Sequence, residues 1–147
     1  MSDDTIVGGP KSLTAEDLDF LRRPLYGFLT TAAGPVPPQP RPVWFEATPE
    51  GTIQLFTGPG TLKVRRSRRD PRASIVVTAP VGERERWVSV AGRTEVIPRD
   101  AHELCKRLAA RYWNLEDPAR RNDLEEILAE DQVRLVIHPE TIDRYAM

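Results

Sequence analysis

The chain has 147 residues, of which 39% are hydrophobic and 29% are charged, and its formal net charge is −1 at pH 7. This length suits one domain with a substantial core, and the balanced charge argues against a protein that coats nucleic acid or an anionic membrane. A single cysteine, Cys105, excludes an internal disulfide, and with only His102 and His138 beside it the chain lacks the ligands of a structural zinc site.

Residues 1–12 are polar and contain glycine and proline, which predicts a flexible lead-in to a single domain over residues 13–147. They lack the basic start and apolar segment of a signal peptide, and no run of the chain approaches membrane-spanning length. We therefore expect a cytoplasmic protein. Folding is expected to begin at Thr14, which forms a capping-box pattern with Asp17 ahead of a short helix that contains Leu18 and Leu21.

Three strands are predicted next, over residues 26–31, 41–47 and 52–57. The turn-rich sequence of residues 48–51 joins the last two, so they are expected to form a hairpin. Between the first two lies a connector, residues 33–40, that holds four prolines, at 35, 37, 38 and 40. Because proline donates no backbone hydrogen bond, this connector is predicted to be an extended loop.

The most basic segment of the chain follows. Gly58 and Gly60 permit a tight turn, and Thr61 is a competent N-cap for a short helix. A cation in the first helical turn, such as Lys63, is disfavoured by the helix dipole unless an anion lies between the cation and the free backbone N–H groups. We therefore predict an anion site here; the alternative is a solvated basic face. The cations on this helix and its exit are Lys63, Arg65, Arg66, Arg68, Arg69 and Arg72.

The second half of the chain predicts further strands and two helices. Residues 73–79 form a nearly continuous apolar run, typical of a buried strand, and residues 87–97 alternate as a long bent strand with Gly92 at a bulge or close backbone approach. Apolar residues then recur at helical spacing over 101–113, including Cys105, which we expect in the core. Asp117 and Pro118 begin a second helix, and residues 133–137 alternate as the final strand.

Six short strands with two helical insertions predict a mainly β protein with helices, of α+β class. A closed or nearly closed antiparallel barrel is favoured, because an open sheet of this size would leave exposed edges. The apolar residues around Val43, Trp44 and Phe45 exceed what one such barrel readily covers, so a symmetric partner is expected on that strand.

No serine elbow, cysteine–histidine pair, paired metal-binding histidines or Walker lysine motif is present in the sequence. His102 and His138 are expected at exposed positions. Trp44 and Trp87 occupy strands that can line a cleft, where either could stack on an aromatic cofactor, although core packing is the commoner fate of such residues. An anion-binding helix without catalytic side chains is typical of an enzyme whose cofactor carries the reactive bonds.

The stretch Lys-Val-Arg-Arg-Ser-Arg-Arg-Asp-Pro-Arg at residues 63–72, followed by an apolar strand and then by Trp-Val-Ser-Val-Ala-Gly-Arg at 87–93, resembles the pyridoxamine-phosphate-oxidase-like split β-barrel superfamily. More narrowly, it is similar to the deazaflavin-dependent oxidoreductases of the flavin/deazaflavin group, which use coenzyme F-420. Residues 40–45 resemble the second strand of that group, and the late helix with residues 133–138 resembles its closing elements. The resemblance covers about residues 13–145.

This resemblance implies a six-stranded antiparallel split β-barrel of the FMN-binding type. It further implies a homodimer with the cofactor at the subunit interface and hydride transfer from reduced F-420 to a small electrophilic substrate, with no catalytic side chain and no metal. Lys63 would hold the tail phosphate, with Arg65, Arg66 and Arg69 nearby, while Arg41, Val43 and Thr57 would approach the ring or its polyol. Thr61 at the helix start and Trp87 complete the candidate cofactor-binding residues.

The chain departs from this group at two places. Residue 66 is arginine where the group often has asparagine, which suits the carboxylates of a polyglutamylated tail, and the proline-rich loop stretches the first hairpin. Other functions stay open. FMN could replace the deazaflavin, because its phosphate also suits Lys63. A non-catalytic barrel that carries the cofactor or binds haem is a second class, though no histidine lies on the expected cleft strands, and a nucleic-acid module is disfavoured because no aromatic-rich strand face accompanies the basic patch.

Overall fold

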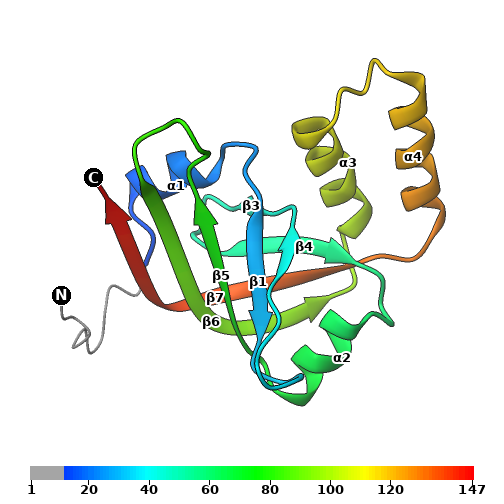
Figure 1. Ribbon diagram of the computed structural model, residues 1–147. Coiled ribbons are helices and arrows are strands. Elements are labelled where there is room, and N and C mark those ends of the chain that lie inside the picture. The colour runs from blue at the N-terminus through cyan, green and yellow to red at the C-terminus, as the bar shows by residue number, and fades with distance from the viewer. Residues whose placement is uncertain (1–11) are drawn as a thin grey trace.

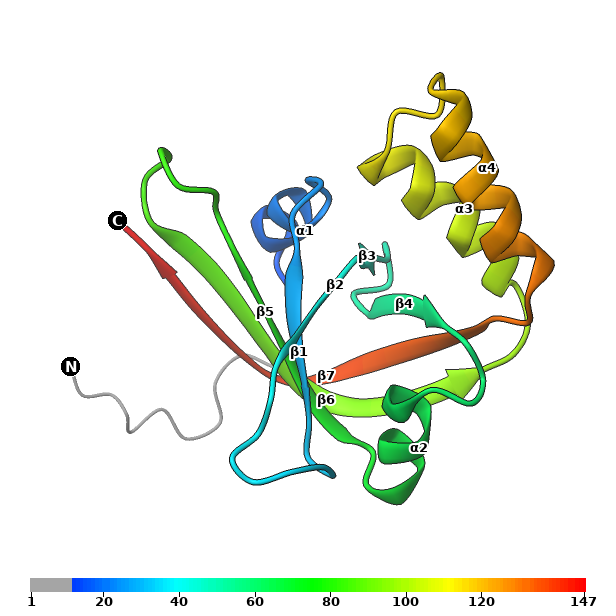
Figure 2. The ribbon, with the colours of Figure 1, turned by 45° about the vertical axis from the view of Figure 1, so that its right-hand side comes forward.

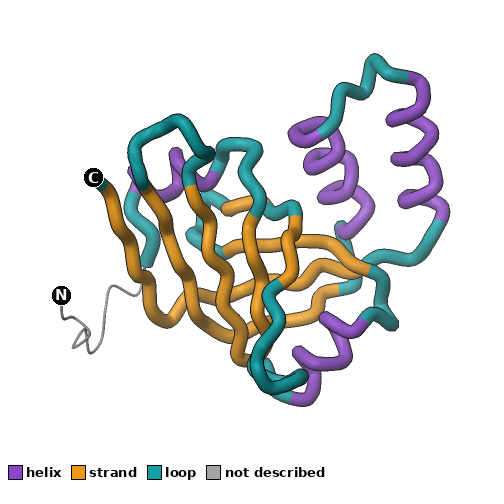
Figure 3. Tube along the Cα trace, viewed as in Figure 1, coloured by secondary structure: helices purple, strands orange, loops and turns teal. Residues whose placement is uncertain are grey.

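The computed structural model describes residues 12–147, so nearly all of the predicted lead-in lies outside the described residues. A single antiparallel sheet of seven strands curls into a half-barrel (Figures 1 and 3) in the strand order β2-β1-β5-β6-β7-β4-β3. The helices and strands are α1 (Ala15–Leu21), β1 (Gly27–Thr31), β2 (Arg41–Val43), β3 (Glu46–Ala47), β4 (Ile53–Thr57), α2 (Leu62–Arg69), β5 (Arg72–Thr78), β6 (Arg86–Ile97), α3 (Ala101–Tyr112), α4 (Pro118–Ala129) and β7 (Val133–Ala146).

The expected mixed α+β split barrel is confirmed, but with seven strands instead of six. The segment predicted as one strand over 41–47 divides at Trp44 and Phe45. Phe45 turns fully into the core, while Trp44 lies parallel to the ring of Tyr112 at a centroid distance of 5.0 Å. Burial still alternates through this break, with Val43 and Ala47 buried on either side of it, but the pairing partner changes. Before the break β2 pairs with β1, and after it β3 pairs with β4.

Two long strands, β6 and β7, pair along their whole length and run through both halves of the half-barrel (Figure 2). Their register shifts between Ala91 and Gly92, and Gly92 pairs with Pro139. A Cβ at Gly92 would overlap the carbonyl oxygen of His138, so the predicted close approach is confirmed. The final strand, predicted to end at Ile137, continues to Ala146 because Pro139 falls at this irregularity, where no regular ladder bond is required.

The strand β5 is not fully buried, contrary to the prediction for residues 73–79. Ile75 and Val77 enter the core, whereas Val76 and Thr78 are exposed on the outer face of the sheet. The run is apolar at almost every position, but the alternation of an antiparallel strand still places every second side chain outside. The consequence is a partly apolar outer face.

The core lies against the sheet and includes Phe20 and Leu21 of α1, while α3 packs on β4 and β7. The capping box of α1 is confirmed: Thr14 N donates to Asp17 Oδ2 at 2.8 Å, and Asp17 N donates to Thr14 Oγ1 at 3.1 Å. In α3 the expected apolar stripe is buried, and burial raises the pKa of the Cys105 thiol to about 11. The predicted helix start at Asp117 is also present, with Ala119 N donating to its carboxylate.

Candidate functional site

The basic helix α2 begins directly after β4, at one end of the half-barrel (Figure 1). Thr61 occupies the N-cap position, but its side chain accepts no hydrogen bond from the helix backbone. Its hydroxyl bonds instead to Thr57 Oγ1 at 2.9 Å and to the carbonyl oxygen of Gly58 at 3.1 Å. The N–H groups of the first turn are therefore left without a side-chain cap, which leaves them for an anion.

The apolar and polar faces of α2 are sharply divided. Val64 and Ser67 are buried against the sheet, and the cations project from the rest of the helix. Within residues 12–147, the side chains of Lys63, Arg65, Arg66, Arg68 and Arg69 form no salt bridge. Neighbouring like charges without counter-ions repel one another, so this end of the molecule favours an anionic ligand.

Arg72 differs from the other cations of this segment. Its guanidinium binds the carboxylate of Asp70, with Nη2 and Oδ2 2.6 Å apart. The side-chain and backbone hydrogen bonds from Arg72 lower the pKa of Asp70 to about 2. The charge of Arg72 is thus neutralised within the chain, and the unpaired cations of residues 63–72 all lie on α2.

Two cavities adjoin the free cations of α2. The smaller, of about 140 Å³, lies between α2 and the strands β1 and β2. The larger, of about 530 Å³, lies between α2 and the proline-rich loop. Arg66 and Leu62 line both. The smaller cavity is lined by Leu29, Thr31, Gln39, Arg41, Leu62, Lys63 and Arg66, and the larger by Gly34, Pro35, Leu62, Arg65, Arg66 and Arg69.

The structure brings most of the predicted cofactor residues to these cavities. Lys63, Arg41 and Arg66 meet around the smaller one, and Arg65 and Arg69 line the larger one. Thr61 contributes the helix start. The proline-rich loop was missed as part of the site, because proline content predicts an extended backbone without indicating which surface the loop covers.

Two of the predicted cofactor-binding residues, Thr57 and Val43, are buried and line neither cavity. Thr57 is 8% exposed, and its hydroxyl is engaged by Thr61. Val43 is also 8% exposed and belongs to the hydrophobic core, and Trp44 packs between Tyr112 and Trp113. The apolar residues of this segment are thus covered by the chain itself, so the reason given above for a partner on this strand is wrong.

Trp87 is not brought to the basic cavities. It lies on the outer face of β6, where its ring stacks on Tyr145 at a centroid distance of 6.1 Å. With Val76, Thr78, Ser89 and Asp143 it lines a separate, shallow cavity of about 350 Å³. Trp87 lines neither of the two cavities beside α2.

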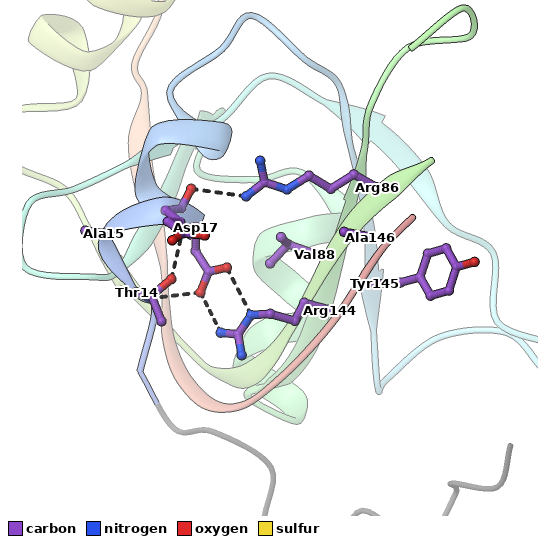
Figure 4. A pocket seen from close by; sticks show the side chains of 9 residues that line it. Thr14, Ala15, Asp17, Arg86, Val88, Arg144, Tyr145 and Ala146 are labelled. Atoms are coloured by element: carbon purple, nitrogen blue, oxygen red, sulfur yellow. Dashed lines mark hydrogen bonds and ion pairs between the residues drawn. The ribbon is translucent and has the colours of Figure 1, made fainter. Parts of the chain in front are cut away.

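A further cavity, of about 620 Å³, lies between α1, the start of β6 and the end of β7 (Figure 4). Its two arginines are engaged within the chain. Arg144 binds Asp17, and Arg86 donates to the carbonyl oxygen of Glu16 at 3.2 Å. Charges of both signs line this cavity, Glu16 and Asp17 against Arg86 and Arg144, so it lacks the cluster of like cations found on α2.

The remaining candidate groups are engaged elsewhere. His138 Nε2 lies 2.9 Å from Glu95 Oε1, and His102 Nε2 lies 2.9 Å from the carbonyl oxygen of Glu130. Over residues 12–147, no three side chains of the metal-ligating types gather as a metal site would require. None of the helices in that range has the length and apolar character needed to cross a bilayer.

Known structures with the same fold include an F-420 reductase, which is 26% identical, with a TM-score of 0.65 over 85% of this chain and 94% of that one. A conserved hypothetical protein of Mycobacterium tuberculosis is 22% identical, with a TM-score of 0.67 over 92% and 87% of the two chains. A FAD-binding protein of Mesorhizobium loti is 22% identical, with a TM-score of 0.61 over 92% and 96%.

A comparison with curated protein sequences gave no significant match. The family described as pyridoxamine 5'-phosphate oxidase matches residues 13–144, from the residue before the α1 capping box almost to the end of β7. That match spans the curled sheet, the uncapped basic helix and both adjoining cavities. The chain therefore belongs to the pyridoxamine 5'-phosphate oxidase family.

Proposed function

We propose that this protein is an oxidoreductase that binds reduced coenzyme F-420 at α2 and uses it to reduce a small electrophilic organic substrate. The observation that carries the proposal is the unpaired cationic surface of α2 beside an uncapped helix start. Family membership and the 26% identity to an F-420 reductase support an oxidoreductase with a cofactor of the flavin type.

The residues around the smaller cavity suit a phosphate. Lys63 supplies a point charge in the first turn, Arg66 supplies a guanidinium one turn later, and Arg41 reaches the cavity from β2. A phosphate here would also accept from the free N–H groups and remove the repulsion between the cations. Leu29 provides an apolar wall, 3% exposed, next to these charges.

When bound, a reduced deazaflavin would supply a hydride, which carries the electron pair with it, so the chain needs no nucleophile of its own. The role left to the protein is to anchor the phosphate, orient the ring and exclude water. This matches the described residues, in which the one cysteine is buried and both histidines are held by other groups.

We further propose that the protein is a homodimer joined through the outer face of β1, β5, β6 and β7. Phe28 pairs with Val76 across β1 and β5, and both are more than a third exposed. In the neighbouring row, Trp87 pairs with Tyr145 across β6 and β7. A partner subunit on this face would cover these side chains and bring Trp87 to a composite cofactor site.

The test is a titration of the apo-protein with F-420 and, separately, with FMN, followed by fluorescence. We expect submillimolar binding of F-420, and Lys63→Ala should weaken it about tenfold to hundredfold, the value of a charge-assisted contact. Arg68→Ala is the matched control, since Arg68 lies on the same helix but lines neither cavity. Equal affinity of Lys63→Ala and the wild type would contradict the phosphate site, and binding of FMN alone would replace the deazaflavin by a flavin.

A further inference from the structure

The cavity of about 620 Å³ beside α1 lies at the end of the half-barrel opposite to α2 (Figures 1 and 4). Val88 of β6 pairs with Arg144 of β7, so alternation along the two strands places Arg86 and Arg144 on the face that carries Val88, which is 1% exposed. Figure 4 shows both guanidinium groups directed toward α1, on either side of Val88. Two cations from neighbouring strands therefore face one cavity.

Arg144 is neutralised and held in place by α1. Its Nε and Nη2 atoms donate to the carboxylate of Asp17, which is 2% exposed. A bidentate pair of this kind fixes the plane of the guanidinium. Its Nη1 atom has no hydrogen-bond partner among residues 12–147. Arg144 thus keeps an oriented donor on the lining of the cavity.

Arg86 and Glu16 contribute charges of opposite sign that are not paired. Arg86 Nη2 donates to the carbonyl oxygen of Glu16 at 3.2 Å, and Arg86 Cζ lies 4.3 Å from the centre of the Phe20 ring. The ring face attracts the cation but supplies no counter-charge. Over residues 12–147, neither Arg86 nor Glu16 forms a salt bridge, with each other or with any other residue. Once Asp17 and Arg144 cancel, one cation and one carboxylate remain on the lining.

This lining suits a ligand that carries one charge of each sign. A simple anion would be attracted by Arg86 and repelled by Glu16, and a simple cation would meet the reverse, whereas a zwitterion gains from both residues. Ala15, Val88 and Ala146 provide apolar lining between the charges. The volume falls within the range of roughly 300–1,000 Å³ that is typical of small-molecule sites.

We propose that this cavity binds a small zwitterion of the α-amino-acid type with an apolar side chain. Its carboxylate accepts hydrogen bonds from Arg86 and from Nη1 of Arg144, and its ammonium group pairs with Glu16. The site is separate from α2 and does not depend on a bound cofactor, so it goes beyond the proposed reduction of a substrate.

The first experiment titrates the full chain, by isothermal calorimetry, with ligands that differ only in their charged groups. One series is L-phenylalanine, 3-phenylpropionate, which lacks the ammonium group, and 2-phenylethylamine, which lacks the carboxylate. The second series is L-leucine with 4-methylpentanoate and 3-methylbutylamine. We expect at least one amino acid to bind about tenfold or more tightly than both of its analogues. An analogue that binds as tightly as its amino acid in both series, or no binding in either series up to about 10 mM, would overturn the proposal.

The variant Glu16→Lys tests the ammonium contact by reversing the charge. Glu16 is exposed, so the substitution leaves the core intact. The amino acid should then bind more weakly than the carboxylate-only analogue, a reversal that a loss of stability cannot produce. Asp19→Lys is the matched control, because Asp19 lies on the same helix but does not line the cavity. The same reversal in Asp19→Lys would mean that overall charge sets the preference, and it would overturn the site.

The variant Arg86→Gln tests the carboxylate contact. Glutamine can still donate to the Glu16 carbonyl oxygen, but it carries no charge. We expect the preference for the amino acid over the amine-only analogue to fall toward one, while Arg84→Gln, outside the cavity lining, keeps the wild-type preference. An unchanged preference in Arg86→Gln would contradict the proposal. Should this variant fail to fold, Glu16→Lys still decides.

A last variant separates this site from α2. Lys63→Ala should bind the amino acid as the wild type does, because Lys63 does not line this cavity. A matching loss of amino-acid affinity in Lys63→Ala would place the ligand at α2 and overturn the second site. The F-420 titration decides the proposed function separately, so either proposal can fail while the other stands.

Discussion

Arg144 donates hydrogen bonds to both carboxylate oxygens of Asp17, a residue 127 positions earlier in the chain. The Nε–Oδ1 and Nη2–Oδ2 distances are 3.0 and 2.5 Å. Asp17 is only 2% exposed and also closes the capping box with Thr14. The pair thus fastens α1 to the end of β7 (Figure 4), and it joins the two ends of the described chain.

We expect Asp17→Asn to destabilise the fold by about 1.5–3 kcal/mol, because it removes the charge from a bidentate, largely buried hydrogen-bonded pair. The free energy of unfolding is measured by urea denaturation. Asp19→Asn is the control on the same helix, since the Asp19–Arg22 pair is exposed and worth at most about 1 kcal/mol. Equal losses in the two variants would mean that the Arg144 pair contributes no more than a surface contact.

The same pair predicts an acid-sensitive component of stability. Burial by itself raises the pKa of Asp17, but the hydrogen bonds from Arg144 and Thr14 outweigh it and hold the pKa below the usual 3.8. A carboxyl group with a lowered pKa in the folded state stabilises the protein above the unfolded pKa, and this stabilisation disappears as the pH falls through the lower folded value. Unfolding measured between pH 5 and pH 2, a range of about three units chosen to span these values, should show a steeper pH dependence in the wild type than in Asp17→Asn. Parallel curves would contradict the assignment.

Gly92 is expected to tolerate no side chain. A Cβ would overlap the His138 carbonyl oxygen and lie 2.8 Å from the carbonyl carbon, and both are backbone atoms that cannot rotate away. Gly92→Ala should therefore cost about 3 kcal/mol or more, or prevent folding. Gly60→Ala serves as the control, because a Cβ there meets nothing within 4 Å, and it should change stability by about 0.5 kcal/mol at most. Thermal unfolding followed by circular dichroism compares the two, and a stable Gly92→Ala would disprove the close approach.

The proposed dimer predicts that Val76→Arg yields a folded monomer. Val76 is 36% exposed on the outer face of β5, so a charge there need not disturb the core. Light scattering should give twice the chain mass for the wild type and the single mass for the variant, with weaker cofactor binding in the variant if Trp87 completes the site. Val81→Arg, at a fully exposed position in the β5–β6 connection, is the control. A wild-type monomer with full cofactor affinity would refute the dimer.

Local sequence signals predicted the elements well and their long-range partners poorly. The capping box of Thr14 and Asp17 spans three residues and was visible in the sequence, whereas nothing near Asp17 indicated Arg144. Likewise, Gly92 predicted a close approach, but only the pairing of β6 with β7 shows that Pro139 lies opposite and that the final strand continues past it.

The candidate site shows the same division. Its cations were found because they are consecutive on one helix. The positions of Gln39 and Gly34 beside these cations were not predicted, because the orientation of a loop depends on packing that no periodicity encodes. Val43 was expected near the cofactor ring, yet the turn of the chain at Trp44 and Phe45 leaves its side chain in the core.

The helices α3 and α4 leave and rejoin the sheet at neighbouring positions, since Ile97 at the end of β6 pairs with Arg134 at the start of β7. In α3 five residues are buried, but α4 buries none of its side chains. The segment between Ile97 and Arg134 therefore begins and ends at paired residues, and the pairing of β6 with β7 sets no requirement on the length of that segment. We therefore expect that residues 114–131 can be replaced by a shorter linker or by a reporter domain without a change in the register of the sheet.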